Sequence, residues 1–241
     1  MLKNKRNSTE KQTFLITQPE NKHSKIDFKE VYRHIRTGIE YSTVGQNVKA
    51  VNVTSSIPGE SKSTTSINLA MIYATKYDNV LLIDCDLRKS TIHRYLKLSN
   101  SRGLTNALME YDESKKISSK YFQFYEDDSF VGKLSVLTSG VKVPNPTELI
   151  GSTVFKDFIN DLKELYDFII IDCPPIVSVS DAIPIGNVVD GTIFVCSSSI
   201  TNRKDAKASI EILKKNNVNI IGTVLTQVEQ DNSKNGYYHY Y

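Results

Sequence analysis

The residues with the clearest chemical potential lie in a short polar segment that reads TSSIPGESKSTT from Thr54 to Thr65. The segment follows an apolar run that predicts a strand and precedes a pattern that predicts a helix. A loop in that position aims successive backbone N–H groups, together with the helix dipole, at an anion. The Lys62 side chain can reach the β- and γ-phosphates of a nucleotide there, and the Ser63 hydroxyl can bind Mg²⁺. The segment therefore predicts a phosphate-binding loop.

This loop departs from the usual pattern GxxxxGK[ST] at both glycine positions, since Ser56 takes the first and Ser61 takes the one before the lysine. If the second position needs a positive φ, a serine there costs about 1 kcal/mol and its Cβ crowds the phosphates. We therefore expect Ser61→Gly to raise turnover or nucleotide affinity. On the pattern alone, a turn rich in small residues remains the alternative.

Two further apolar runs end in acids. One reads LLIDCDLR and ends in Asp84 and Asp86, and the other reads FIIIDCPP and ends in Asp172. Such acids are often only helix N-caps. In an open α/β sheet, however, ligands bind beyond the carboxyl ends of the strands. Both runs end in acids at such strand ends, in a chain that also has a phosphate-binding loop at a third. Together the three motifs predict a magnesium-nucleotide site formed by Lys62, Ser63, Asp84, Asp86 and Asp172.

Strand and helix patterns alternate along the chain, which is typical of a parallel α/β sheet. Several of the strand runs are apolar almost throughout, as expected when helices cover both faces. We therefore predict a mostly parallel central sheet with helices on both faces, similar to P-loop NTPases. The predicted strands are 48–53, 80–83, 134–137, 168–171, 191–196 and 220–225, and the predicted helices are 27–41, 63–76, 152–166 and 203–216. The segment 114–128 is not assigned.

Composition excludes several classes of protein. The 241 residues are 39% hydrophobic and 24% charged, which is ordinary for a globular chain. The formal net charge is only +3, so we predict no nucleic-acid partner. The three cysteines form no CxxC or Cys/His cluster, which indicates neither a zinc site nor a disulfide framework. No apolar run is long enough to span a bilayer.

The two ends of the chain differ from the middle. Residues 1–26 are polar and predict a flexible arm, 27–228 predict the folded domain, and 229–241 predict a disordered tail. In the helix predicted over 27–41, an apolar stripe faces one side, and Glu30, Arg33 and Arg36 project from the other. The tail carries four tyrosines, Tyr237, Tyr238, Tyr240 and Tyr241.

From Glu30 to Tyr241 the chain resembles bacterial tyrosine kinases, the P-loop kinases of capsular and exopolysaccharide synthesis, in their separate cytoplasmic-subunit form. The resemblance rests on the phosphate loop, on LLIDCDLRK and IIIDCPP, and on the segment NPTEL that begins at Asn145. The helix motif Glu30-x-x-Arg33-x-x-Arg36 and the C-terminal tyrosine cluster are more diagnostic than the loop.

The resemblance implies ATP-dependent autophosphorylation, in which one subunit phosphorylates the tail tyrosines Tyr237, Tyr238, Tyr240 and Tyr241 of its neighbour. It implies a ring-like homo-oligomer formed through Glu30, Arg33 and Arg36. It also implies a transmembrane activator of polysaccharide export, so that the kinase is cytoplasmic and reaches the inner face of the membrane only through that partner.

The resemblance also implies roles for the site residues. Lys62 would hold the β- and γ-phosphates, Thr64 would support the α-phosphate, and Asp84 would accept the tyrosine proton. Ser63, Asp86 and Asp172 would position Mg²⁺ directly or through water, while the division of roles between Asp84 and Asp86 stays open. The implied nucleotide-binding residues are Pro58, Gly59, Glu60, Ser61, Lys62, Ser63 and Thr64.

Two alternatives remain. A partitioning or septum-positioning ATPase shares the broad class, but such proteins usually carry a further lysine where this chain has Ile57, and they lack a tyrosine tail. A nucleotide-gated scaffold without catalysis is the second alternative, with Ser61 as the sign of lost chemistry. Without the resemblance, Glu30, Arg33 and Arg36 are most simply a solvated helix face.

Overall fold

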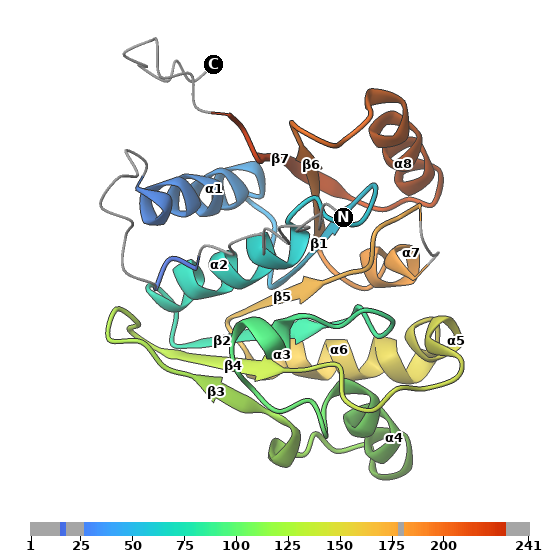
Figure 1. Cartoon of the computed structure of the whole chain (residues 1–241). Helices are drawn as coiled ribbons and strands as arrows, with labels where there is room; N and C mark the ends of the chain where they lie inside the picture. The colour runs from blue at the N-terminus through green and yellow to red at the C-terminus, as the bar shows by residue number, and fades with distance from the viewer. Residues whose placement is uncertain (1–14, 18–26, 178–180, 230–241) are drawn as a thin grey trace, which may run out of the picture.

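The computed structural model describes residues 15–17, 27–177 and 181–229. These residues form a seven-stranded sheet with the order β3-β4-β2-β5-β1-β6-β7, in which only β3, paired with β4 at one edge, runs antiparallel (Figure 1). The predicted fold class is therefore confirmed. The strands are β1 (Ala50–Ser55), β2 (Asn79–Asp84), β3 (Gln123–Tyr125), β4 (Lys133–Leu137), β5 (Phe168–Asp172), β6 (Gly191–Ser197) and β7 (Ile220–Thr226).

Helices cover both faces of this sheet. In β2, Leu81 and Ile83 pack in the core of one face, whereas Val80 and Leu82 pack in the core of the other. Because side chains alternate along a strand, a sheet covered on both faces needs apolar residues at every position. One face carries α1 (Phe28–Ser42), α2 (Lys62–Ala74) and α3 (Ile92–Tyr95), and the other carries α4 (Leu104–Ser114), α5 (Pro146–Ile150), α6 (Thr153–Leu165), α7 (Ala182–Gly186) and α8 (Arg203–Lys215).

The six predicted strands and four predicted helices are confirmed, with ends within two residues of those observed. Local capping explains two of the helix starts. The Asp27 carboxylate accepts from the Glu30 amide at 3.0 Å, and the Ser152 hydroxyl accepts from the Phe155 amide at 3.2 Å. The unassigned segment 114–128 contains a 3₁₀ turn and the short strand β3.

The predicted arm and tail lie outside the described residues, apart from 15–17 and Glu229. Leu15 is buried in the α2 face, and the Ile16 amide donates to Asn68 Oδ1 on α2 at 3.0 Å. The Thr17 hydroxyl lies 2.9 Å from the hydroxyl of Tyr125 in β3. These three residues are therefore packed on the domain, a contact that the sequence did not predict.

The strand order brings the chemical motifs together. β5 lies between β2 and β1, and Asp84 at the end of β2 is directly opposite Asp172 at the end of β5. The segment that follows β1 leads into α2, so the phosphate-binding loop emerges at the same edge of the sheet. Figure 1 shows that α1 lies beside α2, on the same face of the sheet.

Candidate active site

The loop between β1 and α2 has the backbone geometry of an anion-binding turn. Gly59 has φ 90° and Ser61 has φ 65°, and α2 begins at the next residue, Lys62. Left-handed residues within such a turn point neighbouring N–H groups to one side, where they form a concave site for an anion. The start of a long helix adds its own free N–H groups. Ser61 therefore does occupy a position where glycine would be unstrained, as its sequence position suggested.

The Lys62 ammonium lies between two carboxylates. Its Nζ atom is 3.1 Å from Asp86 Oδ2 and 3.6 Å from Asp172 Oδ2, and it also lies 3.3 Å from the Ser63 hydroxyl. The side chains of Lys62 and Asp86 are 10% and 7% exposed, whereas that of Asp172 is fully buried. The structure thus brings the predicted lysine and two of the predicted acids into direct contact.

Asp172 is held by hydroxyl groups from the first turns of α2. The Ser63 hydroxyl donates to Asp172 Oδ2 at 2.6 Å, and the Ser66 hydroxyl donates to Asp172 Oδ1 at 3.0 Å. Ser66 was not predicted as a site residue, although it follows Ser63 by three positions and so lies on the same helix face. A hydroxyl beside a buried carboxylate is a suitable oxygen donor set for Mg²⁺.

Asp84 is enclosed by the backbone of the segment that follows β2. It is fully buried, and its carboxylate accepts from the backbone amides of Asp86, Thr91 and Ile92, each at 3.2 Å. Burial, and next the nearby carboxylate of Asp172, together raise the pKa of Asp84 to about 7 against the opposing effect of Lys62. Asp84 therefore fixes the turn that carries Asp86, and of these two acids it is Asp86 that contacts Lys62 directly.

The site carries more negative than positive charge, as expected of a site that receives a cation. Burial lowers the pKa of Lys62, but the carboxylates of Asp172, Asp86 and Asp84 outweigh that effect and raise it. Burial also raises the pKa of Asp172. Within the described part of the chain, no three His, Cys, Asp or Glu side chains are arranged as a metal cage. The carboxylates of Asp86 and Asp172 beside the Ser63 hydroxyl suit Mg²⁺, which usually takes one or two carboxylates and completes its shell with phosphates and water.

The other side of the loop is held by uncharged groups from the ends of β6 and β7. The Glu60 carboxylate is fully buried and accepts from the Ser56 hydroxyl, from the Ile57 amide at 2.7 Å and from the Thr201 hydroxyl. The Thr226 hydroxyl donates to the Glu60 carbonyl at 2.9 Å. Glu60, predicted to bind nucleotide, thus uses its side chain to brace the loop internally.

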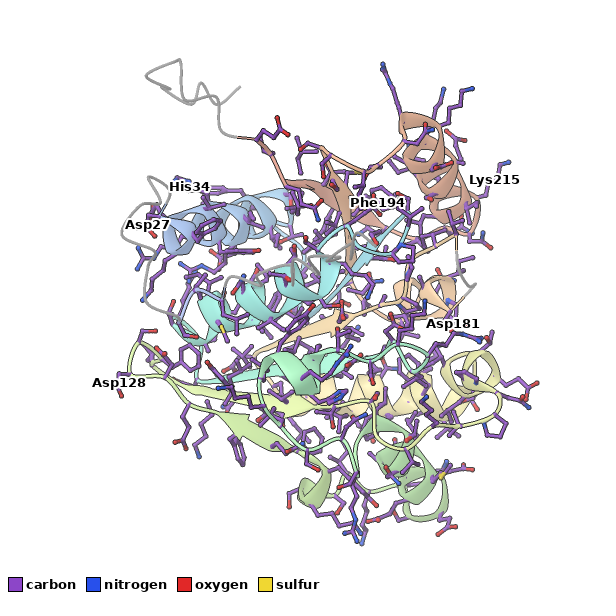
Figure 2. All side chains as sticks on the ribbon, in the orientation of Figure 1. Asp27, His34, Asp128, Asp181, Phe194 and Lys215 are labelled. Carbon is purple, nitrogen blue, oxygen red and sulfur yellow. The ribbon has the colours of Figure 1, made fainter. Side chains whose placement is uncertain are left out.

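An arginine of the second acidic motif connects three segments at the rim of the site. Arg88 Nε donates to Asp181 Oδ2 at 3.2 Å, and its Nη2 donates to the hydroxyl of Thr147 at 2.9 Å. Thr147 also donates to Asp181 Oδ1 at 2.5 Å. Figure 2 labels Asp181 at the start of α7. The NPTEL segment, to which the sequence assigned no role, therefore supports the rim through Thr147.

The three charged residues predicted on α1 divide into two groups. Glu30 and Arg33 are 49% and 45% exposed and form an ion pair with each other at 2.9 Å. The Arg36 side chain is only 16% exposed, and its Nη1 donates to the Ile72 carbonyl in the last turn of α2 at 2.9 Å. The same carbonyl accepts from the Thr75 hydroxyl at 2.8 Å, and a cation beside it is favourable at the C-terminal end of a helix. Arg36 therefore attaches α1 to α2 within the monomer.

The remaining predicted positions are placed as follows. Pro58 and Thr64 lie on the phosphate-binding loop and on the first turn of α2, beside the site. The four tail tyrosines lie outside the described residues. Among the helices that the structure describes, none is long and apolar enough to cross a membrane. A cavity of about 370 Å³, lined in part by Lys49 and Phe168, lies at the amino ends of β1 and β5, away from the phosphate-binding loop.

Comparison with known proteins identifies close relatives over the whole domain. A family model described as an AAA domain matches residues 48–189. The chain is 38% identical to the tyrosine-protein kinase YwqD of Bacillus subtilis (strain 168), covering 98% of this chain and 94% of the relative. It is 34% identical to the putative tyrosine-protein kinase CapB of Staphylococcus aureus, covering 90% and 91%.

Solved structures agree with these relatives. The chimerical protein CapA2B2 superposes with a TM-score of 0.77 at 32% identity, covering 88% of each chain. A ParA family ATPase from Chlorobium tepidum TLS and the septum site-determining protein MinD from Pyrococcus horikoshii OT3 superpose with TM-scores of 0.60 and 0.58. Their identities of 17% and 22% support a shared fold and no more.

Proposed function

This chain belongs to the bacterial tyrosine-protein kinase family, and from that premise we propose that it is an ATP-dependent autokinase that phosphorylates the tail tyrosines of neighbouring subunits. The observation that supports this most directly is the position of Lys62, which lies at the start of α2 within 3.6 Å of both Asp86 and Asp172. Such a compact set suffices because phosphoryl transfer needs mainly positioning and neutralisation of charge.

The site residues are proposed to act as follows. Mg²⁺ and ATP supply the transferable phosphoryl group and the main neutralising charge. Lys62 leaves Asp86 to hold the β- and γ-phosphates, and the loop N–H groups, including that of Thr64, hold the remaining phosphate oxygens. Ser63 and Asp172, already joined at 2.6 Å, would provide oxygen atoms for the metal directly or through water, which leaves the Asp86 carboxylate for the tyrosine.

The acceptor of the tyrosine proton is one of the two acids at the carboxyl end of β2, Asp84 or Asp86. The raised pKa of Asp84, about 7, suits a general base, but its carboxylate is fully buried and accepts from backbone amides. Asp86 is slightly exposed and becomes available once Lys62 moves to a phosphate. We therefore assign the proton to Asp86 in place of Asp84, with Asp84 holding the turn in position.

The exposed part of α1 supports a proposed contact between subunits. Glu30 and Arg33 are free to exchange their mutual ion pair for pairs with a neighbouring chain, which would bring a tail to the next active site in a ring-like oligomer. A tail reaches a neighbour's site more readily than its own if the subunits are arranged head to tail. A transmembrane activator of polysaccharide export would recruit the kinase to the inner face of the membrane and stimulate it, so that phosphorylation regulates capsular or exopolysaccharide synthesis.

Parallel measurements of ADP release and phosphotyrosine test this proposal. The purified chain is incubated with Mg-ATP, with and without the cytoplasmic fragment of an activator, and the phosphorylated sites are identified by mass spectrometry. We expect phosphate on Tyr237, Tyr238, Tyr240 and Tyr241. Hydrolysis without phosphotyrosine would instead indicate an ATPase of the partitioning class, and nucleotide binding without either product would indicate a scaffold.

A further inference from the structure

Gln227, the residue that follows β7, makes an unusually complete set of hydrogen bonds. Its side-chain Nε2 donates to the Gly59 carbonyl at 2.8 Å and to the Ser61 hydroxyl at 3.0 Å. Its Oε1 accepts from the hydroxyls of Ser197 and Ser199, both at 2.7 Å. Both ends of the amide are therefore used, and the side chain connects the end of β6 to the phosphate-binding loop.

The backbone of Gln227 is also specialised. Its φ is 55°, a left-handed conformation that a residue other than glycine seldom adopts, and its carbonyl accepts from the Ser198 hydroxyl at 2.6 Å. Such a conformation persists where surrounding interactions compensate for its cost. Here the compensation comes from the hydrogen bonds that aim the amide at the loop.

The contact with Ser61 links two strained residues. Ser61 has φ 65°, and as the N-cap of α2 it makes no hydrogen bond from its side chain to the helix. Its hydroxyl instead accepts from Gln227. The serine that stands where the pattern has glycine thus has a role that glycine could not fill.

We propose that Gln227 is a positioning residue for nucleotide binding, which holds Ser61 and Gly59 in the conformation that directs the loop N–H groups at the phosphates. The inference rests on the proposed function, since it requires that the loop bind a nucleotide. Gln227 precedes Tyr237 by ten residues. The same residue therefore connects the nucleotide loop to the strand that leads into the tail.

A double-mutant cycle between Ser61→Ala and Gln227→Met tests the contact. Methionine keeps the length of glutamine and removes its hydrogen bonds, and alanine removes only the Ser61 hydroxyl. The measured quantity is the dissociation constant of Mg-ADP by calorimetry, supported by the KM for ATP and kcat. We expect Ser61→Ala to weaken Mg-ADP binding about fivefold in the wild-type background, the equivalent of one neutral hydrogen bond, and to have almost no effect in the Gln227→Met background.

Gln227→Met alone should raise the KM for ATP more than it lowers kcat, because it disturbs the binding loop and leaves the acids in place. Gln46→Met, at an exposed position between α1 and β1, is the matched control and should change neither. An equal effect of Ser61→Ala in both backgrounds would refute the inference, as would unchanged Mg-ADP affinity in Gln227→Met. If Gln227→Met does not fold, a normal affinity of Ser61→Ala for Mg-ADP is by itself enough to refute the inference. A wild-type chain that binds no Mg-ADP would contradict the proposed function itself.

Discussion

The two flanks of the phosphate-binding loop are built from different chemistry. On the side of β2 and β5, Lys62 lies among buried carboxylates, and burial raises the pKa values of two of them, Asp84 and Asp172. On the side of β6 and β7, the loop is held by hydroxyl and amide groups, with Gln227 at the centre. The acidic flank is electrostatically incomplete until a cation arrives, whereas on the neutral flank uncharged hydroxyl and amide donors already satisfy the buried carboxylate of Glu60.

This difference separates two requirements of a nucleotide site. Buried like charges reduce the stability of the empty protein, but they bind a metal and respond to a transferred phosphoryl group. Neutral hydrogen bonds contribute little to charge neutralisation, but they fix the loop before the ligand arrives. We therefore expect substitutions on the acidic flank to change catalysis and pH dependence, and those on the neutral flank to change nucleotide affinity.

The largest expected effect is that of Lys62→Met. Without a mobile cation on the transferred charge, autophosphorylation should fall by about 100-fold or more. The domain should still fold, because the aliphatic part of the side chain is retained and the acids can take up protons. Anti-phosphotyrosine blotting with circular dichroism measures both properties. Lys156→Met, at an exposed position on α6, is the control, and normal phosphotyrosine in folded Lys62→Met would remove Lys62 from the mechanism.

The second prediction concerns pH and the acidic flank. The Asp84 carboxyl binds its proton more tightly in the folded protein, where its pKa is about 7, than in the unfolded chain, where the ordinary value is 3.8. The stability due to this proton is therefore full below pH 4 and is lost as the pH rises through about 7, by an amount on the order of 4 kcal/mol.

Thermal unfolding of the nucleotide-free protein between pH 4 and 8 measures this loss, and Asp84→Asn should flatten the curve. Gln227→Met, on the neutral flank, should leave its shape unchanged. Identical pH dependence in wild type and Asp84→Asn would show that Asp84 is not the group whose protonation stabilises the folded protein.

A similar contrast is found on α1, where Arg36 is hydrogen-bonded to α2 within the monomer and Arg33 is exposed. Arg36→Ala should lower stability by about 1–2 kcal/mol, since it leaves the Ile72 carbonyl without its charged donor. Arg33→Ala removes only an exposed ion pair and should change stability by less than about 0.5 kcal/mol. Light scattering should nevertheless show a smaller oligomer for Arg33→Ala. Unchanged assembly in Glu30→Ala with Arg33→Ala would contradict the proposed subunit contact.

The smallest expected effect is that of Ser61→Gly. The sequence predicted a gain in affinity or turnover. The φ of 65° agrees with that prediction, because a left-handed backbone costs serine about 1 kcal/mol that glycine avoids. The substitution also removes the hydrogen bond to Gln227, which is worth a similar amount. We now expect Mg-ADP affinity within about twofold of wild type, and clearly above that of Ser61→Ala. Calorimetry of the three proteins decides this, and a large gain for glycine would mean that the Gln227 contact contributes nothing.

The sheet and the acidic flank could be predicted from the sequence because their signals are local. Apolar runs that end in Asp84 and Asp172 mark strand ends, and the order of the strands brings those ends together. The neutral flank could not be predicted in this way. Gln227 lies 166 positions from Ser61, and a single glutamine after a strand carries no pattern. The inward position of Arg36 was likewise hidden, because helical spacing places it with Glu30 and Arg33.

The central claim, that one chain phosphorylates the tail of another, is tested most directly by mixing two variants, of which one lacks the catalytic lysine and the other lacks the acceptor tyrosines. One partner is Lys62→Met with an intact tail, and the other is the active protein without residues 237–241. The account predicts that phosphotyrosine appears on the Lys62→Met chain after Mg-ATP is added, at the four tail tyrosines located by mass spectrometry. Absence of phosphate from that chain, or its appearance mainly at Tyr121 or Tyr125, while the wild type still phosphorylates itself, would contradict it.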